Sequence, residues 1–167
     1  MAAKGQEKQF ALDSNVLFDL AAEKDFAHTF REVYQERGYS LRVPPTVIQE
    51  LTYYAIEKHC AETPLALKSL QEMRKWQLLP FELQSVGHGI AEQFCRGIIN
   101  AGLLPEGEFN DGLILAETAF VGISVLVSSD GDLLSIEDVA LRVHFEEADL
   151  TPVQVFHPKR LLKALGR

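Results

Sequence analysis

Four acidic residues at well-separated positions could form one reactive centre: Asp13, Glu50, Asp111 and Asp130. Carboxylates a few ångströms apart raise one another's pKa, so such a cluster needs a counter-charge, which a divalent cation supplies. A ligand set of oxygens without histidine or thiolate favours Mg²⁺ or Mn²⁺ over zinc or copper. Ions of this kind polarise a phosphate and activate a water molecule. The chemistry that the four acids predict is therefore hydrolysis of a phosphate ester.

Two of the acids follow predicted strands. Residues 9–12 form an apolar run of strand length that ends at Asp13, and the β-branched run 123–128 ends shortly before Asp130. In an open parallel sheet, ligands bind beyond the carboxyl ends of the strands. Both acids are expected at that edge.

The other two acids lie in predicted helices whose N-termini should face the same edge. Glu50 lies near the start of a helix over residues 46–58, and Asp111 lies in the first turn of a helix over residues 108–120. The T-x-x-Q pattern that begins at Thr46 predicts a capping box for the first of these helices.

The rest of the chain alternates between predicted helices and strands. Further helices are predicted over residues 16–22, 26–36, 63–76 and 86–101 and from residue 158, and further strands over residues 39–43, 77–83, 141–145 and 153–156. This alternation implies right-handed crossovers and a mainly parallel sheet covered by helices on both faces. We expect a frayed, disordered tail over residues 1–8 and a single domain over residues 9–167.

Helix geometry ranks the neighbouring acids. Glu117 lies six residues after Asp111, roughly 240° around a helix, so we expect it on a different face and solvated. Glu108 lies three residues before Asp111, on the same side, and is kept as an auxiliary ligand. Asp132 lies two residues after Asp130 and is kept as an auxiliary candidate ligand, ranked below Asp130.

Composition and charge argue against several classes of protein. The 167 residues carry a net charge of −8, which argues against a protein that coats nucleic acid by bulk electrostatics. The sequence has no apolar run long enough for a membrane span or a secretory signal, so we expect a cytoplasmic protein without a membrane partner. Cys60 and Cys95 lack the spacing of a zinc site and are interpreted as reduced, buried thiols.

Each acid also has a purely structural interpretation. Asp13 could cap the helix that follows it, and Glu50 and Asp111 could complement helix dipoles. Asp130 begins an ordinary Asp-Gly turn. The basic segment 158–163 is interpreted as a solvated helix face rather than a track for RNA.

Four segments together resemble the motifs of the PIN-domain nucleases, in their toxin-like prokaryotic branch. Residues 10–17 (FALDSNVL) resemble the opening motif, and residues 45–51 (PTVIQEL) are similar to the segment with the helical glutamate. Residues 110–116 (NDGLILA) and 127–132 (VSSDGD) resemble the third and fourth acidic motifs. Their order and spacing agree with the family over nearly the whole chain.

The resemblance implies a three-layer α/β/α sandwich with a sheet of about five parallel strands. It also implies Mg²⁺ or Mn²⁺ at the four acids, hydrolysis of RNA by a metal-activated water, and supporting roles for Asn15 and Ser128. Many small bacterial members are toxins that dimerise and are neutralised by an antitoxin. This chain departs from the smallest members in its acidity and in its longer helical stretch between Glu50 and Asp111.

The leading hypothesis is thus a metal-dependent endoribonuclease, as a toxin or as an RNA-processing enzyme. Alternatives are a phosphatase or structure-specific DNA nuclease with the same metals, and a non-catalytic PIN-like interaction module. A phospho-accepting receiver domain needs adjacent acids after the first strand, whereas Asp13 stands alone there.

Overall fold

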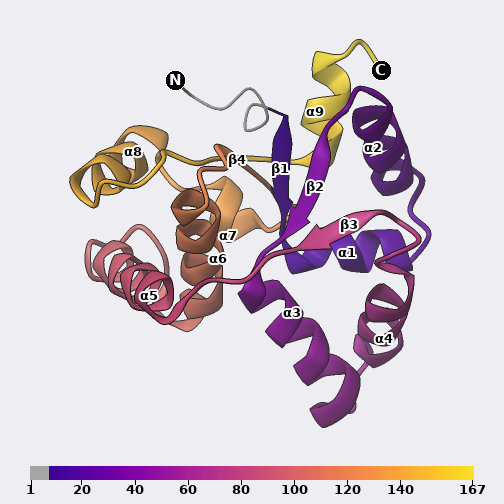
Figure 1. Ribbon diagram of the computed structural model, residues 1–167, viewed down its shortest axis with the longest axis horizontal. Coiled ribbons are helices and arrows are strands. Elements are labelled where there is room, and N and C mark those ends of the chain that lie inside the picture. The colour runs from indigo at the N-terminus through magenta and orange to yellow at the C-terminus, as the bar shows by residue number, and fades with distance from the viewer. Residues whose placement is uncertain (1–7) are drawn as a thin grey trace.

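A sheet of short parallel strands organises the chain in the computed structural model, which describes residues 8–167 (Figure 1). Within these residues the strands are β1 (Gln9–Leu12), β2 (Ser40–Val43), β3 (Leu78–Pro80), β4 (Val125–Val127) and β5 (Gln154–Phe156). Their order is β3-β2-β1-β4-β5, and every neighbouring pair is parallel. The predicted parallel α/β sheet of about five strands is confirmed.

Helices cover both faces of the sheet. They are α1 (Ser14–Ala21), α2 (Asp25–Glu36), α3 (Pro45–Thr52), the π-helical turn η1 (Tyr53–Glu57), α4 (Thr63–Glu72), α5 (Ser85–Asn100), the 3₁₀ turn η2 (Glu106–Glu108), α6 (Phe109–Phe120), α7 (Gly131–Leu134), α8 (Asp138–Glu147) and α9 (Pro158–Ala164). In Figure 1, α5, α6 and α8 lie on one side of the sheet, and α1, α2, α4 and α9 lie on the other.

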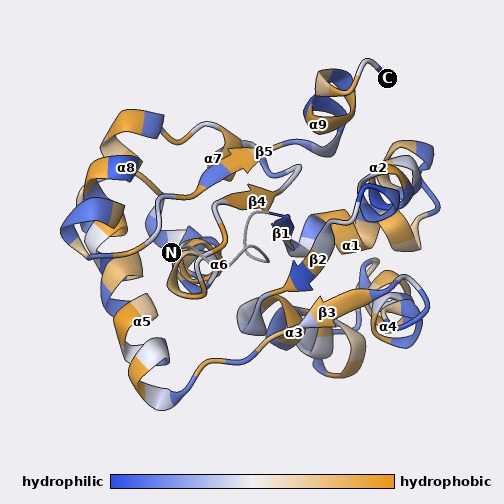
Figure 2. Cartoon of the chain, turned by 45° about the horizontal axis from the view of Figure 1, so that its top comes forward, coloured by the Kyte–Doolittle hydropathy of each residue, from blue (hydrophilic) through white to orange (hydrophobic). Residues whose placement is uncertain are grey.

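The core follows from this layering, because strands covered on both faces read as nearly continuous apolar runs. Leu12 and Leu126, on neighbouring strands, are fully buried, and so are Phe30 of α2 and Phe145 of α8 on opposite sides of the sheet. In Figure 2, hydrophobic colour marks β3, β4 and β5 between the helices. Among the described residues, no helix is both long enough and apolar enough to cross a bilayer.

The predicted tail over residues 1–8 lies outside the described residues except for Lys8. The carbonyl of Lys8 accepts a hydrogen bond of 2.9 Å from the Ser40 amide, and its Nζ donates to the Arg37 carbonyl at 3.0 Å. Lys8 therefore extends the pairing between β1 and β2 by one residue.

The strand predicted over residues 141–145 is wrong, because this segment belongs to α8. Leu141 and Phe145 are four residues apart, so both lie on one helix face, and both are buried. The Glu137 carboxylate caps the helix by accepting hydrogen bonds from the two amides at the start of α8. A run of apolar residues this short does not separate a helix from a strand.

The capping box predicted at Thr46 is also wrong. Pro45 occupies the first turn of α3, and the Thr46 amide and hydroxyl donate hydrogen bonds of 3.0 and 2.7 Å to the two carboxylate oxygens of Glu117 in α6. Glu117 was expected in solvent but is buried, and this burial raises its pKa above the ordinary value. The pair connects the helix that carries Glu50 to the helix that carries Asp111.

The contact between α5 and α6 depends on Gly112. A Cβ at Gly112 would lie within about 2.4 Å of Cys95 Sγ, closer than atoms approach without displacement. We expect Gly112→Ala to lower the free energy of unfolding by about 1–3 kcal/mol, as overpacking in a core does. Urea titration measures the change, and adding Cys95→Ala should restore part of the loss.

Gly97→Ala in α5 is the matched control, because a Cβ there meets no atom within 4 Å. It should raise the free energy of unfolding by roughly 0.5–1 kcal/mol, since alanine favours a helix over glycine. Equal stability of the Gly112→Ala protein and the parent would contradict the proposed close contact.

Candidate metal centre

Three of the four predicted acids converge at the carboxyl edge of the sheet. Asp13 follows β1, Asp130 follows the neighbouring strand β4, and Asp111 lies in the first turn of α6. One carboxylate oxygen from each lies within 4.8 Å of the other two. Asp13 and Asp111 are buried, whereas Asp130 is half-buried.

Hydrogen bonds fix the orientation of Asp13. Its Oδ1 accepts from the Ser14 amide at 2.8 Å, and its Oδ2 accepts from the Ser128 hydroxyl at 2.7 Å. The Asp130 amide donates to the same Ser128 hydroxyl at 3.0 Å. Ser128 thus connects two of the acids. Asp13 also caps α1, so it has both the structural role of a helix cap and a place in the acidic cluster.

Asp130 begins α7, a helix of one turn that was not predicted. Its Oδ1 accepts from the Asp132 amide at 2.8 Å. Asp132 itself is exposed and is not among the three acids that converge. The Asp-Gly sequence at this point therefore starts a short helix rather than a simple turn.

Glu50 lies beside the cluster rather than within it. It occupies the second turn of α3, not the opening turn, and its Oε1 accepts from the Ser14 hydroxyl at 2.8 Å. Burial raises the pKa of Glu50 to about 7, because it outweighs the hydrogen bond from Ser14, and the negative charge of Asp13 raises the pKa further. A side-chain hydrogen bond with Asn110 favours the charged form.

Glu108 lies beside the acidic cluster, whereas Asn15 bonds to the loop before Asp130. Glu108 is half-buried beside Asp111 and raises the pKa of that carboxyl, so it belongs to the surroundings of the cluster. Asn15 accepts a hydrogen bond of 3.1 Å from the Ser129 amide and touches none of the three acids through a hydrogen bond among the described residues. It connects the start of α1 to the loop that leads to Asp130.

The electrostatics of the cluster favour a bound cation. Burial, followed by the charges of Asp13 and Asp130, raises the pKa of Asp111 to about 9. Burial also raises the pKa of Asp13 to about 6, despite the hydrogen bonds from Ser128 and Ser14. At neutral pH Asp111 in the metal-free cluster therefore retains a proton that a cation can replace.

One carboxylate oxygen of the cluster is buried and available as a metal ligand. Asp111 Oδ2 is buried and has no hydrogen-bond partner among the described residues. An unsatisfied buried acceptor is costly, by about 1–3 kcal/mol or more for a charged group, unless something binds it. The residues present therefore fit a divalent cation held by Asp13, Asp111 and Asp130.

Sequence reasoning missed the connecting roles of two side chains. The Ser14 amide donates to Asp13, and the Ser14 hydroxyl donates to Glu50. Asp19 accepts from the Ser129 hydroxyl at 3.2 Å and pairs with Lys24 at 2.7 Å. A hydroxyl directly after the acid was the signal for Ser14, whereas nothing in the sequence pointed to Asp19.

Comparisons with known proteins agree with this geometry. The family model described as PIN domain matches residues 10–139. A search of curated proteins found no match.

Solved structures show the same fold at low sequence identity. One is VapBC2 from Rickettsia felis, solved with a fragment of promoter DNA. It aligns with a TM-score of 0.60 and 13% sequence identity, and the alignment covers 88% of this chain and 98% of the other. DNA-bound VapBC from Salmonella typhimurium aligns with a TM-score of 0.51 and 18% sequence identity, and the alignment covers 88% of this chain and 97% of the other. FitAcB from Neisseria gonorrhoeae aligns with a TM-score of 0.50 and 16% sequence identity, and the alignment covers 89% of this chain and 97% of the other.

The raised pKa values of Asp13 and Asp111 predict a stability that depends on pH. Each group binds its proton more tightly in the folded state than in the unfolded state, so its contribution to stability is present at low pH. That contribution is lost as the pH rises through about 6 for Asp13 and about 9 for Asp111. With EDTA present, the melting temperature should fall between pH 5 and pH 9.

Mg²⁺ should reverse this loss at pH 8 by binding the ionised acids. Above pH 9 in EDTA, where Asp111 of the parent is ionised, the Asp111→Asn protein should melt higher than the parent, because it lacks one repelling charge, and at pH 8 it should gain less from Mg²⁺. A melting temperature that is flat with pH and insensitive to Mg²⁺ in the parent would contradict the repulsion.

Proposed function

Because the chain belongs to the PIN domain family, we propose that it is a metal-dependent endoribonuclease that hydrolyses phosphodiester bonds in RNA. The PIN family consists generally of nucleases, which supports a nuclease here. The observation that carries the proposal is the convergence of Asp13, Asp111 and Asp130, with one buried carboxylate oxygen left without a partner.

Asp13, Asp111 and Asp130 would hold Mg²⁺, with Mn²⁺ as a substitute, because all three offer hard oxygen ligands. When bound, the ion supplies charge that polarises the scissile phosphate and lowers the pKa of a water molecule. The chain's part is to orient these ligands. Ser128 does so by donating to Asp13 while accepting from the Asp130 amide, so the two carboxylates have a fixed relation before any substrate arrives.

Glu50 would accept the proton of the attacking water. Its carboxyl lies outside the three converging acids, with a pKa near 7, and a general base works best when its pKa is close to the operating pH. The Ser14 hydroxyl fixes the Glu50 carboxylate at 2.8 Å, on the side of the helix that faces Asp13. Glu108 would serve as an auxiliary acid beside Asp111.

The biological setting that we propose is that of a toxin in the cytoplasm, paired with an antitoxin protein and forming a homodimer. Supporting this setting, the chain has the fold of the VapBC and FitAcB structures and spans nearly the full length of the aligned chains. The antitoxin would mask the acidic centre until it is removed.

The direct test is cleavage of structured and unstructured RNA by the purified protein with Mg²⁺, with Mn²⁺ and with EDTA. We expect cutting with either metal and none with EDTA. Asp13→Asn and Asp111→Asn should each reduce the rate by more than the roughly 10–100-fold that is typical for loss of a supporting metal-site partner, while the proteins stay folded.

Asp132→Asn is the matched control, because this aspartate lies two residues after Asp130 but is exposed and outside the cluster. It should cut at the rate of the parent. Full activity of a folded Asp111→Asn protein, or loss of activity in Asp132→Asn alone, would contradict the assignment.

A further inference from the structure

Helix α9 carries basic side chains without acidic partners. Lys159, Arg160 and Lys163 form no ion pair with any described residue. We propose that these three side chains, named here the α9 basic face, bind phosphates of the RNA strand along the stretch that leads away from the bond that is cut. This inference rests on the proposed ribonuclease function, and it revises the interpretation of residues 158–163 as a merely solvated face.

Helix α9 begins at the carboxyl edge of the sheet, the edge that also carries the metal centre. Strand β5 is parallel to β4, so α9 leaves β5 at the same carboxyl edge from which Asp130 leaves β4. The Ser128 amide donates to the Phe156 carbonyl at 3.0 Å, and the Ser128 hydroxyl donates to Asp13. The first turn of α9 therefore leaves the strand next to β4, and the helix then runs along α2 toward Tyr34.

The helix is fixed in place by packing. The Tyr34 hydroxyl donates to the Leu161 carbonyl at 2.7 Å, which joins α9 to α2, and Leu162 is buried. The basic side chains and His157 line an open hollow of about 550 Å³. A hollow of this kind gives a phosphate several donors at once.

Aromatic rings orient two of the cations. Lys159 Nζ lies 4.9 Å from the centre of the Phe26 ring, and Arg160 Cζ lies 5.2 Å from the centre of the Phe156 ring. Cation–π contacts of this type restrict the side chains while leaving their donors available. Less conformational entropy is then lost when a phosphate binds.

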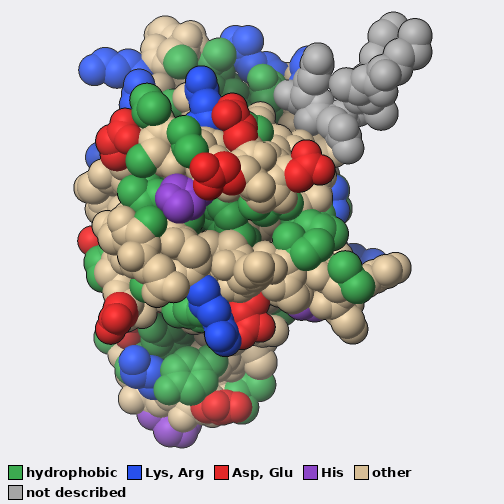
Figure 3. All heavy atoms as spheres, turned by 90° about the vertical axis from the view of Figure 1, so that its left-hand side faces the viewer, with side chains coloured by type: hydrophobic (Ala, Val, Ile, Leu, Met, Phe, Trp, Pro, Cys, Tyr) green, Lys and Arg blue, Asp and Glu red, His purple; other side chains and the backbone are tan. Residues whose placement is uncertain are grey.

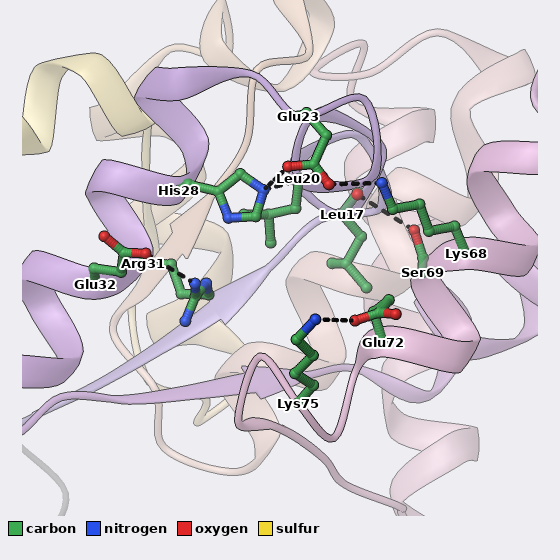
Figure 4. Close-up of polar contacts among 10 residues, drawn as sticks. All are labelled: Leu17, Leu20, Glu23, His28, Arg31, Glu32, Lys68, Ser69, Glu72 and Lys75. Carbon is green, nitrogen blue, oxygen red and sulfur yellow. Dashed lines mark hydrogen bonds and ion pairs between the residues drawn. The ribbon is translucent and has the colours of Figure 1, made fainter.

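The groove between α2 and α4 provides the contrast. Its Lys68 pairs with Glu23 at 2.6 Å and its Lys75 with Glu72 at 3.4 Å, as Figure 4 shows. These cations are neutralised within the protein. On the face formed by α5 and α8, acidic and basic side chains likewise intermingle (Figure 3).

Charge explains why such a face is needed. The chain has a net charge of −8, which repels RNA, and the metal centre adds carboxylates at the point of cleavage. Residues 157–167 contain four Lys or Arg and no Asp or Glu, so they offset this repulsion locally. The pKa of His157 is lowered by burial and by Lys159, so the attraction comes from the lysines and arginines.

The test measures binding of a fluorescein-labelled 20-nucleotide single-stranded RNA to the full chain in EDTA, which prevents cutting, at several salt concentrations. The variant carries Lys159→Ala, Arg160→Ala and Lys163→Ala. The slope of log affinity against log salt should fall in magnitude by about 2, since each phosphate contact to a single strand contributes about 0.7. Between 50 and 200 mM salt, the parent should lose roughly 20-fold more affinity than the variant.

The control carries Lys68→Ala and Lys75→Ala, the two paired cations of the groove, together with Arg74→Ala beside Lys75, and so removes the same net charge elsewhere. It should keep the slope of the parent, and equal losses in both variants would overturn the proposal, because bulk charge would then be the cause. Tighter binding of poly-glutamate than of RNA to the α9 basic face would also overturn it, in favour of an acidic protein partner.

Cleavage separates this inference from the proposed function. With Mg²⁺, the α9 variant should cut RNA with a raised KM and an unchanged kcat, since the lost contacts are uniform binding contacts. A parent that cuts RNA while the α9 variant keeps its KM and its salt slope would overturn the α9 basic face and leave the nuclease intact. Salt-dependent binding through α9 without cutting would instead support the face and contradict the nuclease.

Discussion

Mutual repulsion among Asp13, Asp111 and Asp130 is the constraint around which the site is arranged. Their carboxylates lie within 4.8 Å of one another, two of them buried, and the pKa of Asp111 is raised to about 9 as a result of burial and of the neighbouring charges. A protein without a use for this arrangement gains nothing from it, because solvated or apolar residues would cost less. A divalent cation bound between the three carboxylates would cancel their repulsion, which explains why the three acids lie together.

Several contacts distant from the acids keep them at this edge. Parallel pairing of β1 and β4 brings Asp13 beside Asp130, and Ser128 bonds to both. The buried pair of Thr46 and Glu117 joins α3 to α6, and so fixes the helix of Glu50 relative to the helix of Asp111. Function at this site therefore depends on packing between helices as much as on the acids themselves.

The sequence predicted the features that repeat along the chain. Alternation of strands and helices predicted the parallel sheet, and the acids at strand ends predicted Asp13 and Asp130 at one edge. It could not predict that Leu141 and Phe145 lie in a helix, because a short apolar run fits either structure. The burial of Glu117 could not be predicted because its partner, Thr46, is 71 residues away, and local helix geometry says nothing about such contacts.

The central claim is that a divalent cation binds between the three acids, and the most direct test is crystallography with Mn²⁺. Anomalous difference maps from crystals grown with Mn²⁺ should show an ion bonded to oxygens of Asp13, Asp111 and Asp130 at about 2.0–2.3 Å, with Asp111 Oδ2 among its ligands. An ordered site without an anomalous peak at saturating Mn²⁺, or a peak only at surface carboxylates, would contradict the account.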